Sequence, residues 1–455
     1  MQTAPITQGD KGEGITVVVG LGRTGLSCAR YLAARGVPLM VVDSRPEPPG
    51  LAALRAELPE VPVRLGPFEA AHFRDAARLV VSPGVALSEP AIHDAASMGV
   101  EVTGDIDLFA GAARAPVVAI TGSNGKSTVT TLVGEMAADQ DLDVRVGGNL
   151  GTPALELLAG GMPDLYVLEL SSFQLETTRQ LRPATAVVLN ISADHMDRYP
   201  SLAVYVRAKS HIYEGDGVKV VNRDDAIVMS MLHSGRRVIG FRRGAPAQGD
   251  YGLVQRADEA WLARGDTVLM AESELAMDGR HNTLNALAAL ALGEGVGLHI
   301  QPMLDTLRRF RGLPHRCYPI AEAGGVRWID DSKATNVGAA LAALEGLGRG
   351  RPLVWIGGGE GKGQDFAPLG DALATHAKAV VLLGRDAGLI ETAIAGRVPV
   401  ARAGDMARAV ALARQGAAAG DVVLLSPACA SFDMFRDYSH RGECFAAAVA
   451  GEVGS

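Results

Sequence analysis

The chain has 455 residues, which is too long for a single hydrophobic core and predicts about three domains. Its net charge of −8 argues against nucleic acid as the main partner, because phosphate backbones attract a basic face. The four cysteines are scattered without CxxC spacing, so neither a zinc site nor a disulfide framework is indicated. No apolar run reaches membrane-spanning length and residues 1–14 lack the apolar core of a signal peptide, so we expect a cytoplasmic protein without a membrane partner.

The N-terminal segment alternates predicted strands and helices. Strands are expected at residues 15–19 and 38–42, with a helix at 25–35 between them. The loop after the first strand reads GLGRTG, and Asp43 follows the second strand, which together form the fingerprint of a dinucleotide-binding fold. The glycines show only that a diphosphate fits there. NAD, a nucleotide-sugar diphosphate and a purely structural turn all remain compatible with this loop.

A second glycine loop, TGSNGKST at residues 121–128, follows the apolar strand 116–120 and opens a helix with apolar spacing over 127–136. In this order the backbone N–H groups and the helix N-terminus favour phosphate. Lys126 would reach the outer phosphates of ATP, and the Ser127 hydroxyl would bind Mg²⁺. Ile120 stands where the usual motif has a glycine, so the loop is a shortened form, and an ordinary strand–helix turn is the alternative.

Polar residues close two later apolar runs of the same segment. Glu169 lies near the end of the run LYVLEL, where a carboxylate is a candidate Mg²⁺ ligand, a helix N-cap or a solvated acid. His195 follows the next predicted strand in a loop with two aspartates, so a metal or phosphate role stands beside a structural one. Lys209 has the pattern of a solvated helix lysine.

The rest of the chain contains one irregular stretch and then a third α/β segment. Residues 235–277 are expected to carry short antiparallel strands, and 282–292 a strong helix. The helical pattern breaks near 311–314. Further strands are predicted at 326–329, 353–356, 379–383 and 422–425, with alanine-rich helices between them.

Three polar loops follow strands of this last segment, at residues 330–336, 357–363 and 426–433. Each combines hydroxyls, a lysine or backbone amides, which are the groups that hold carboxylates. Because the carboxyl ends of parallel strands lie at one edge of a sheet, the three loops together predict a binding site.

Taken together, these motifs resemble the Mur ligases of peptidoglycan synthesis. The matching stretches run in order along nearly the whole chain: GLGRTGLS, VSPG, AITGSNGKST, GGNLG, LELSSFQLE, NISADHMDRY, HNTLNALAAL, GLPHR, DDSKATN and LLSPACASFDMF. DSKATN with SPACASFD is the specific part, because other Mur ligases and folylpolyglutamate synthetases share the ATP loop without that pair. The match is to the branch that adds D-glutamate.

The resemblance implies three consecutive α/β domains. They are a Rossmann-like UDP-substrate-binding domain at 1–104, a P-loop ATPase-like central domain at 105–312 and a Rossmann-like amino-acid-binding domain at 313–455. The implied activity is ATP-dependent addition of D-glutamate to UDP-N-acetylmuramoyl-L-alanine through an acyl phosphate, by a monomer that uses two Mg²⁺ ions. An NAD-dependent oxidoreductase would leave the ATP loop unexplained. A nucleotide-sugar sensor without catalysis is disfavoured because the implied catalytic residues are intact.

The resemblance also implies residue roles. The catalytic residues are Lys126, Glu169, His195 and Lys209. The metal ligands are Ser127, Glu169, His195 and Lys209, the last as a CO₂-derived carbamate (N6-carboxylysine). The ATP-binding residues are Gly122, Ser123, Asn124, Gly125, Lys126, Ser127, Thr128, Asn282, Asn285, Arg316 and Asp331. The UDP-substrate residues are Gly20, Leu21, Gly22, Arg23, Thr24, Asp43, Ser44, Arg45, Ser82, Pro83, Gly84 and Asn149. The D-glutamate residues are Lys333, Thr335, Lys362, Ser431 and Tyr438.

Overall fold

The structure is a computed structural model that describes residues 14–232, 237–277, 279–348 and 353–453. Its strands form three sheets, and helices alternate with most of the strands, so the predicted α/β fold class is confirmed. The contacts divide the chain into two compact units. One comprises Met1–Thr121, Leu142–Ala186 and Arg207–Gly217, and the other comprises Gly122–Asp141, Val187–Val206 and Val218–Ser455. Within the described residues no helix is both long and apolar enough to cross a bilayer.

The first sheet has five parallel strands in the order β3-β2-β1-β4-β5. Its strands are β1 (Ile15–Val19), β2 (Leu39–Asp43), β3 (Val63–Leu65), β4 (Ala76–Val81) and β5 (Glu101–Thr103), and its helices are α1 (Arg23–Ala33), α2 (Leu51–Glu57) and α3 (Pro90–Ser97). The strand order reverses between β1 and β4, which is the position where ligands bind in open α/β sheets. The glycine loop after β1 and the Ser82–Gly84 turn after β4 both lie at this point.

The second sheet has nine strands in the order β14-β13-β12-β11-β10-β9-β6-β8-β7. Its strands are β6 (Val117–Thr121), β7 (Val144–Gly148), β8 (Leu165–Glu169), β9 (Thr185–Val188), β10 (Val218–Asn222), β11 (Val238–Phe241), β12 (Tyr251–Arg256), β13 (Glu259–Arg264) and β14 (Thr267–Ala271). The associated helices are α4 (Asp105–Ala112), α5 (Lys126–Ala138), α6 (Ser172–Glu176), α7 (Leu202–Ser210), α8 (Ala226–Ser230), α9 (Arg280–Gly295) and α10 (Ile300–Arg309).

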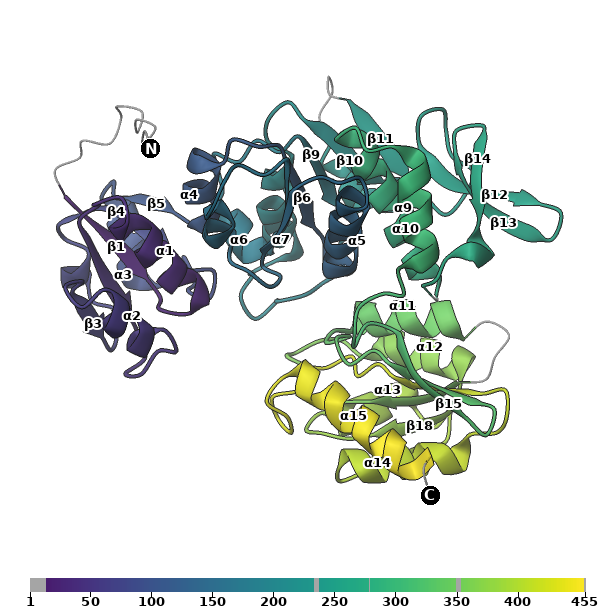
Figure 1. Ribbon diagram of the computed structural model, residues 1–455. Helices are drawn as coiled ribbons and strands as arrows, with labels where there is room; N and C mark the ends of the chain where they lie inside the picture. The colour runs from purple at the N-terminus through teal and green to yellow at the C-terminus, as the bar shows by residue number, and fades with distance from the viewer. Residues whose placement is uncertain (1–13, 233–236, 278, 349–352, 454–455) are drawn as a thin grey trace. The chain divides into compact units, whose positions relative to one another are not determined.

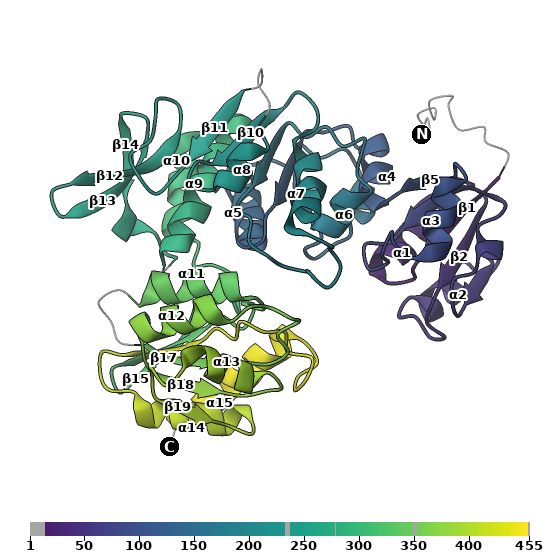
Figure 2. The same cartoon turned by 180° about the vertical axis from the view of Figure 1, so that it is seen from behind.

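Most of this sheet is parallel, but its last three strands are antiparallel. β7 and β8 pair parallel with each other, β6 pairs parallel with β8, and β10 pairs parallel with β11. The strands β12, β13 and β14 form an antiparallel meander, and β12 with β13 makes a hairpin that projects from the sheet (Figure 2). The antiparallel strands predicted for residues 235–277 are therefore confirmed, apart from β11, which is parallel to its neighbour. Residues 235 and 236 lie outside the described ranges.

The third sheet has six strands in the order β15-β16-β20-β17-β18-β19, all parallel except β15. Its strands are β15 (Tyr318–Ala323), β16 (Val326–Asp330), β17 (Leu353–Gly357), β18 (Ala377–Leu382), β19 (Val400–Arg402) and β20 (Val422–Leu425). Its helices are α11 (Val337–Leu347), α12 (Ala367–His376), α13 (Ala387–Ile394), α14 (Met406–Gly416) and α15 (Tyr438–Val453).

Two hydrophobic cores cover the two faces of this third sheet. Along β17, Leu353 and Trp355 pack with α11, α12 and α13, whereas Val354 and Ile356 pack with α14 and α15. Figure 1 shows α14 and α15 on the face opposite α11 and α12. This alternation follows from the two-residue period of a strand, and burial on both faces explains why the strands are continuously apolar. Polar groups are left to the loops at the strand ends.

Candidate functional site

The glycines of the second loop have conformations that other residues rarely adopt. Gly122 has φ +151 and Gly125, the N-cap of α5, has φ +84. A Cβ at Gly125 would lie 2.5 Å from the Asn285 side-chain oxygen, and one at Gly122 would lie 3.0 Å from Leu189 Cβ. The loop therefore needs glycine at both positions for backbone angle and for space. Its backbone runs directly into the N-terminus of α5, as an anion-binding loop requires.

Two side chains of this loop make defined contacts. The Lys126 ammonium donates to the carbonyl oxygens of Gly122 and Ser123, at 2.9 and 3.0 Å. The Ser127 hydroxyl accepts a hydrogen bond of 2.6 Å from the Arg316 guanidinium. Arg316 is 189 residues further along the chain, so this pairing brings two predicted ATP residues from distant segments together.

A cavity of about 850 Å³ lies beside this loop, which is within the usual size range of small-molecule sites. The predicted ATP residues that line it are Asn124, Gly125, Thr128, Asn282, Asn285, Arg316 and Asp331. Gly122, Ser123, Lys126 and Ser127 are not among the lining residues. The cavity also has contributors that the sequence did not indicate, among them Asn222, Asp225, Phe241, Arg243 and His281. No sequence pattern separated these from structural residues, although His281 adjoins Asn282 in a quoted motif.

Asp331 is a buried carboxyl group in this cavity. It directly follows β16 and accepts hydrogen bonds from the Cys317 backbone N–H (3.1 Å) and the Ser426 hydroxyl (2.7 Å). Burial raises its pKa to about 7, because removal from water penalises the charged form more than these hydrogen bonds favour it. The group therefore can hold a proton near neutral pH.

A second cavity, of about 470 Å³, lies at the reversal point of the first sheet. Every predicted UDP residue lines it except Leu21. The Leu21 N–H instead donates to the Asp43 carboxylate at 2.6 Å, which fixes the glycine loop to the end of β2. The Arg23 guanidinium donates to the Gly151 carbonyl at 3.0 Å, so this loop also contacts the glycine-rich segment after β7.

Asp43 is fully engaged by protein donors. One oxygen accepts from the backbone N–H and Nε of Arg45, both at 2.9 Å, and the other accepts from Leu21 and from Arg45 Nη2 at 2.7 Å. Burial alone would raise the pKa of Asp43, but these hydrogen bonds outweigh it and lower the pKa below its ordinary value. The carboxylate is therefore ionised and paired with Arg45.

Sequence reasoning missed several residues of the second cavity. They are Phe68, Val85, Gly148, Gly151, Pro153 and Gln174. For Gln174 the sequence signals only a helix cap, because the spacing of Ser171 and Gln174 is that of a capping box. The structure confirms the box: the Gln174 N–H donates to Ser171 Oγ at 3.2 Å, and the Ser171 N–H donates to Gln174 Oε1 at 3.1 Å.

Glu169 is neither a helix cap nor a solvated acid. It is 3% exposed at the end of β8, and the N-cap of the following helix α6 is Ser171. Its carboxylate accepts a hydrogen bond of 2.7 Å from the Asn149 amide. Among the described residues no three His, Cys, Asp or Glu side chains gather as a metal site.

Lys209 is buried, so the expectation of a solvated helix lysine is wrong. The side chain is 1% exposed, and its ammonium donates to the Thr121 hydroxyl at 3.1 Å. The sequence did contain a signal for this burial. Tyr205, Ala208, Lys209 and Ile212 follow the i, i+3, i+4, i+7 spacing of one helix face, and all four are buried.

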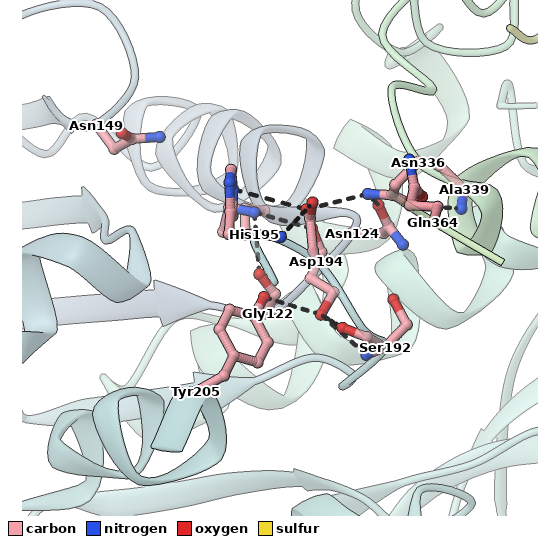
Figure 3. Close-up of polar contacts among 12 residues, drawn as sticks. Gly122, Asn124, Asn149, Ser192, Asp194, His195, Tyr205, Asn336, Ala339 and Gln364 are labelled. Carbon is pink, nitrogen blue, oxygen red and sulfur yellow. Dashed lines mark hydrogen bonds and ion pairs between the residues drawn. The ribbon is translucent and has the colours of Figure 1, made fainter. Parts of the chain in front are cut away.

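His195 lies in the loop after β9 with a left-handed backbone, φ +57. Burial lowers its pKa, and the Lys362 and Lys126 cations add to that effect against the opposing Asp194 carboxylate. The imidazole is therefore neutral at physiological pH. Figure 3 shows Asp194 between His195 and Asn336, with the Nε2 of His195 at 3.7 Å from Asp194 Oδ2.

The three polar loops of the third segment lie side by side, as predicted. They follow β16, β20 and β17, which are adjacent parallel strands. Glu360 and Ala430 bridge two of the loops through backbone hydrogen bonds of 3.0 and 2.9 Å. Lys333 Nζ lies 3.9 Å from the centre of the Tyr438 ring, and Ser431 is buried.

Three family models match the chain in order. They are the N-terminal domain of MurD-like Mur ligases (residues 14–104), the Mur ligase middle domain (120–293) and the Mur ligase glutamate ligase domain (315–429). The chain belongs to the Mur ligase family. It is an ATP-dependent ligase of peptidoglycan precursor synthesis, as predicted.

Its curated relatives place it within one branch of the family. A relative from Nitrosococcus oceani is 55% identical over 434 residues, covering 95% of this chain and 96% of its own length. One from Pseudomonas aeruginosa is 53% identical over 435 residues, covering 95% and 97%. Both are named UDP-N-acetylmuramoylalanine–D-glutamate ligase.

Solved structures share the fold at low identity. The MurF ligase from Thermotoga maritima in complex with ADP has a TM-score of 0.63 at 17% identity, covering 97% of this chain and 95% of its own. The UDP-N-acetylmuramate–alanine ligase MurC from the same organism has a TM-score of 0.59 at 20% identity, covering 96% and 100%. These similarities support the architecture alone.

Proposed function

We propose that the enzyme joins D-glutamate to UDP-N-acetylmuramoyl-L-alanine with conversion of ATP to ADP and phosphate. The observation that carries this proposal is the composition of the cavity beside the phosphate loop. The same cavity is lined by Asn124 and Gly125 and by Asp331, Lys333 and Gly338 of the first polar loop and the helix after it. A nucleotide and a second, carboxylate-bearing substrate can therefore meet there.

The reaction needs activation because a carboxylate and an amine do not condense in water. The L-alanine carboxylate attacks the γ-phosphate of ATP and forms an acyl phosphate with release of ADP. The neutral amine of D-glutamate then attacks the acyl carbon, and phosphate leaves from the tetrahedral intermediate. Lys126 would exchange its loop carbonyl partners for phosphate oxygens, and Arg316 already lies beside the phosphate loop through Ser127.

The donor groups fit Mg²⁺. Glu169 is a buried carboxylate that accepts a hydrogen bond from the Asn149 amide. Mg²⁺ takes oxygen ligands and is usually held by one or two carboxylates together with substrate phosphates. When bound, the ion would neutralise triphosphate charge. Ser127, Glu169, His195 and a modified Lys209 are the residues that would supply ligands.

The burial of Lys209 supports its modification. The side chain is 1% exposed and its Nζ lies 3.1 Å from the Thr121 hydroxyl, so a group formed on Nζ would be shielded from bulk water. A neutral amine can add CO₂ and lose a proton to give a carbamate. That product replaces a cation by two oxygen ligands, which suits a magnesium site.

The first sheet suits UDP better than NAD. In NAD enzymes the carboxylate at the end of the second strand accepts from the ribose hydroxyls. Here both oxygens of Asp43 already accept from Arg45 and one from Leu21. A ribose bound in the NAD manner would have to displace Arg45, whereas a uridine diphosphate can use the glycine loop and the Ser82–Gly84 turn. We also expect a monomer that acts in the cytoplasm, where ATP and UDP-linked precursors occur.

The test is ADP release by the purified enzyme with UDP-N-acetylmuramoyl-L-alanine and ATP. Sustained ADP release should require D-glutamate, and L-glutamate should not replace it. UDP should compete with the sugar nucleotide, and NAD should not. Turnover with another amino acid but not D-glutamate, or inhibition by NAD without inhibition by UDP, would contradict the proposal.

A further inference from the structure

Asn336 is the last residue of the polar loop at 330–336, which is proposed to bind D-glutamate. It connects this loop to the phosphate loop at 121–128. It is 3% exposed and precedes α11. Its amide nitrogen donates to Asp194 Oδ2 at 3.1 Å and lies 3.4 Å from Asn124 Oδ1 in the phosphate loop. Its amide oxygen accepts from the Ala339 backbone N–H at 2.8 Å and so caps α11 (Figure 3).

These contacts need an amide at this position. The helix cap needs an acceptor, and Asp194 needs a donor on the same short side chain. Aspartate or serine would also cap the helix well. Aspartate, however, would place a second carboxylate against Asp194, and serine is too short to bridge both groups. Asparagine at position 336 therefore serves both the helix cap and the contact with Asp194 in the loop after β9 (the Asp194 loop).

The start of α11 is also hydrogen-bonded to the polar loop that contains Lys362 (the Lys362 loop). The Val337 N–H donates to Gln364 Oε1 at 2.8 Å, and Gln364 Nε2 donates to the Gly361 carbonyl at 2.9 Å. The start of α11 also packs closely against the loop after β9, because a Cβ at Gly338 would lie only 2.9 Å from the Ser192 hydroxyl. A displacement of Asn336 would therefore shift α11 and the Lys362 loop relative to the phosphate loop.

We propose that Asn336 is a positioning residue that holds the amino-acid loops against the phosphate loop and the Asp194 loop, so that the amine meets the acyl phosphate before water does. The proposal rests on the ligase reaction proposed above. It assigns Asn336 no contact with substrate. Its loss should affect the second half of the reaction, amide formation, more than the first half, phosphoryl transfer.

The experiment compares Asn336→Asp and Asn336→Ser with the wild type. The readouts are the KM for D-glutamate, the KM for ATP, and the ratio of ADP released to amide formed. A hydrogen bond to a charged group contributes about 1.5–3 kcal/mol, so the KM for D-glutamate should rise about 10- to 100-fold. The ATP KM should change less than about threefold, and the ADP-to-amide ratio should rise above one, most in Asn336→Asp.

Asp405→Asn is the matched control. Asp405 caps α14 through the Arg408 N–H at 2.8 Å, and the substitution exchanges an acid and an amide at an exposed N-cap. Its kinetics should stay within about twofold of the wild type.

Each outcome decides the proposal. If both Asn336 variants keep a wild-type ADP-to-amide ratio and KM, the side chain is only a helix cap and the proposal is wrong. If they lose thermal stability and all kinetic parameters together, the role is structural and the proposal is again wrong. Should Asn336→Asp fail to fold, Asn336→Ser decides, because serine retains the cap. A wild-type enzyme that releases ADP without need of D-glutamate would instead contradict the proposed function.

Discussion

Two aspartates at the start of α4 should respond in opposite directions to the same change, aspartate to asparagine. Asp105 is 3% exposed; one carboxylate oxygen accepts from Gln174 Nε2 at 3.0 Å, and the other is buried without a hydrogen-bond partner among the described residues. The oxygens of Asp107 accept from the backbone N–H groups of Arg179 and Gln180 at 2.8–2.9 Å. Burial raises the pKa of Asp105 from 3.8 to about 6.

The raised pKa of Asp105 determines how large the stability change is and over which pH range it occurs. The folded protein binds the Asp105 proton more tightly than the unfolded chain, so stability from this group is full below about pH 4 and falls as the pH rises to about 6. A shift of about two units corresponds to about 3 kcal/mol. An asparagine at this position would avoid that loss, because an amide is neutral and keeps the acceptor for Gln174. Asp105→Asn should therefore raise the free energy of unfolding at pH 7.5 by up to about 3 kcal/mol and have little effect at pH 4.

Asp107→Asn should destabilise the protein by about 1–3 kcal/mol, because an amide nitrogen would face a backbone N–H donor. The assay is urea unfolding of each variant at pH 4.5, 6 and 7.5, monitored by intrinsic fluorescence and circular dichroism. A stability change for Asp105→Asn that is negative at neutral pH, or that is the same at all three values, would refute the reasoning about Asp105. If both variants changed the free energy of unfolding by the same amount and in the same direction, the local contacts of Asp105 and Asp107 would not explain their effects on stability.

The other predictions concern catalysis. Lys209→Ala should be nearly inactive, with partial recovery in added short-chain carboxylates that supply the missing oxygen ligands, as measured by ADP release; full activity of the unsupplemented variant would remove Lys209 from the site. Lys362→Ala should raise the KM for D-glutamate by about 2–5 kcal/mol in free-energy terms. Ser431→Ala and Thr335→Ala should cost nearer 1–3 kcal/mol, because each loses one hydroxyl donor. The KM for ATP should change little in all three variants, and a Lys362→Ala enzyme with weakened ATP and normal D-glutamate would place that lysine in the nucleotide site.

The elements that the sequence predicted well are those whose pattern is local. The strands β1, β6 and β17 are largely apolar runs that are closed by glycine or polar residues, and each lies within one residue of its predicted position. The edge formed by the three polar loops followed from one general rule, that parallel strands present their carboxyl ends together. The apolar run at residues 186–191 predicts a longer strand than β9, which ends at Val188, because Leu189 and Ile191 continue the apolar pattern after the chain has left the sheet.

The features that could not be predicted depend on long-range contacts. Arg316 reaches Ser127 across 189 residues, and neither residue has a local pattern that indicates the other. Gln174 looks like an ordinary capping residue, but its side chain also lines a cavity and contacts Asp105. The residue type predicts that Lys209 is exposed, because lysine is exposed in most proteins, whereas its helix face carries other buried residues.

The proposed reaction requires that the site favour amide formation over hydrolysis. An acyl phosphate is lost if water reaches it before the amine. Three polar loops follow strands of the third sheet; the Glu360–Ala430 bridge joins two of them, and Asn336 of the other contacts the phosphate loop and Asp194. The Asn336 variants therefore test this arrangement. If the KM for D-glutamate rises much more than the KM for ATP, amide formation depends on the position of the polar loops more than phosphoryl transfer does.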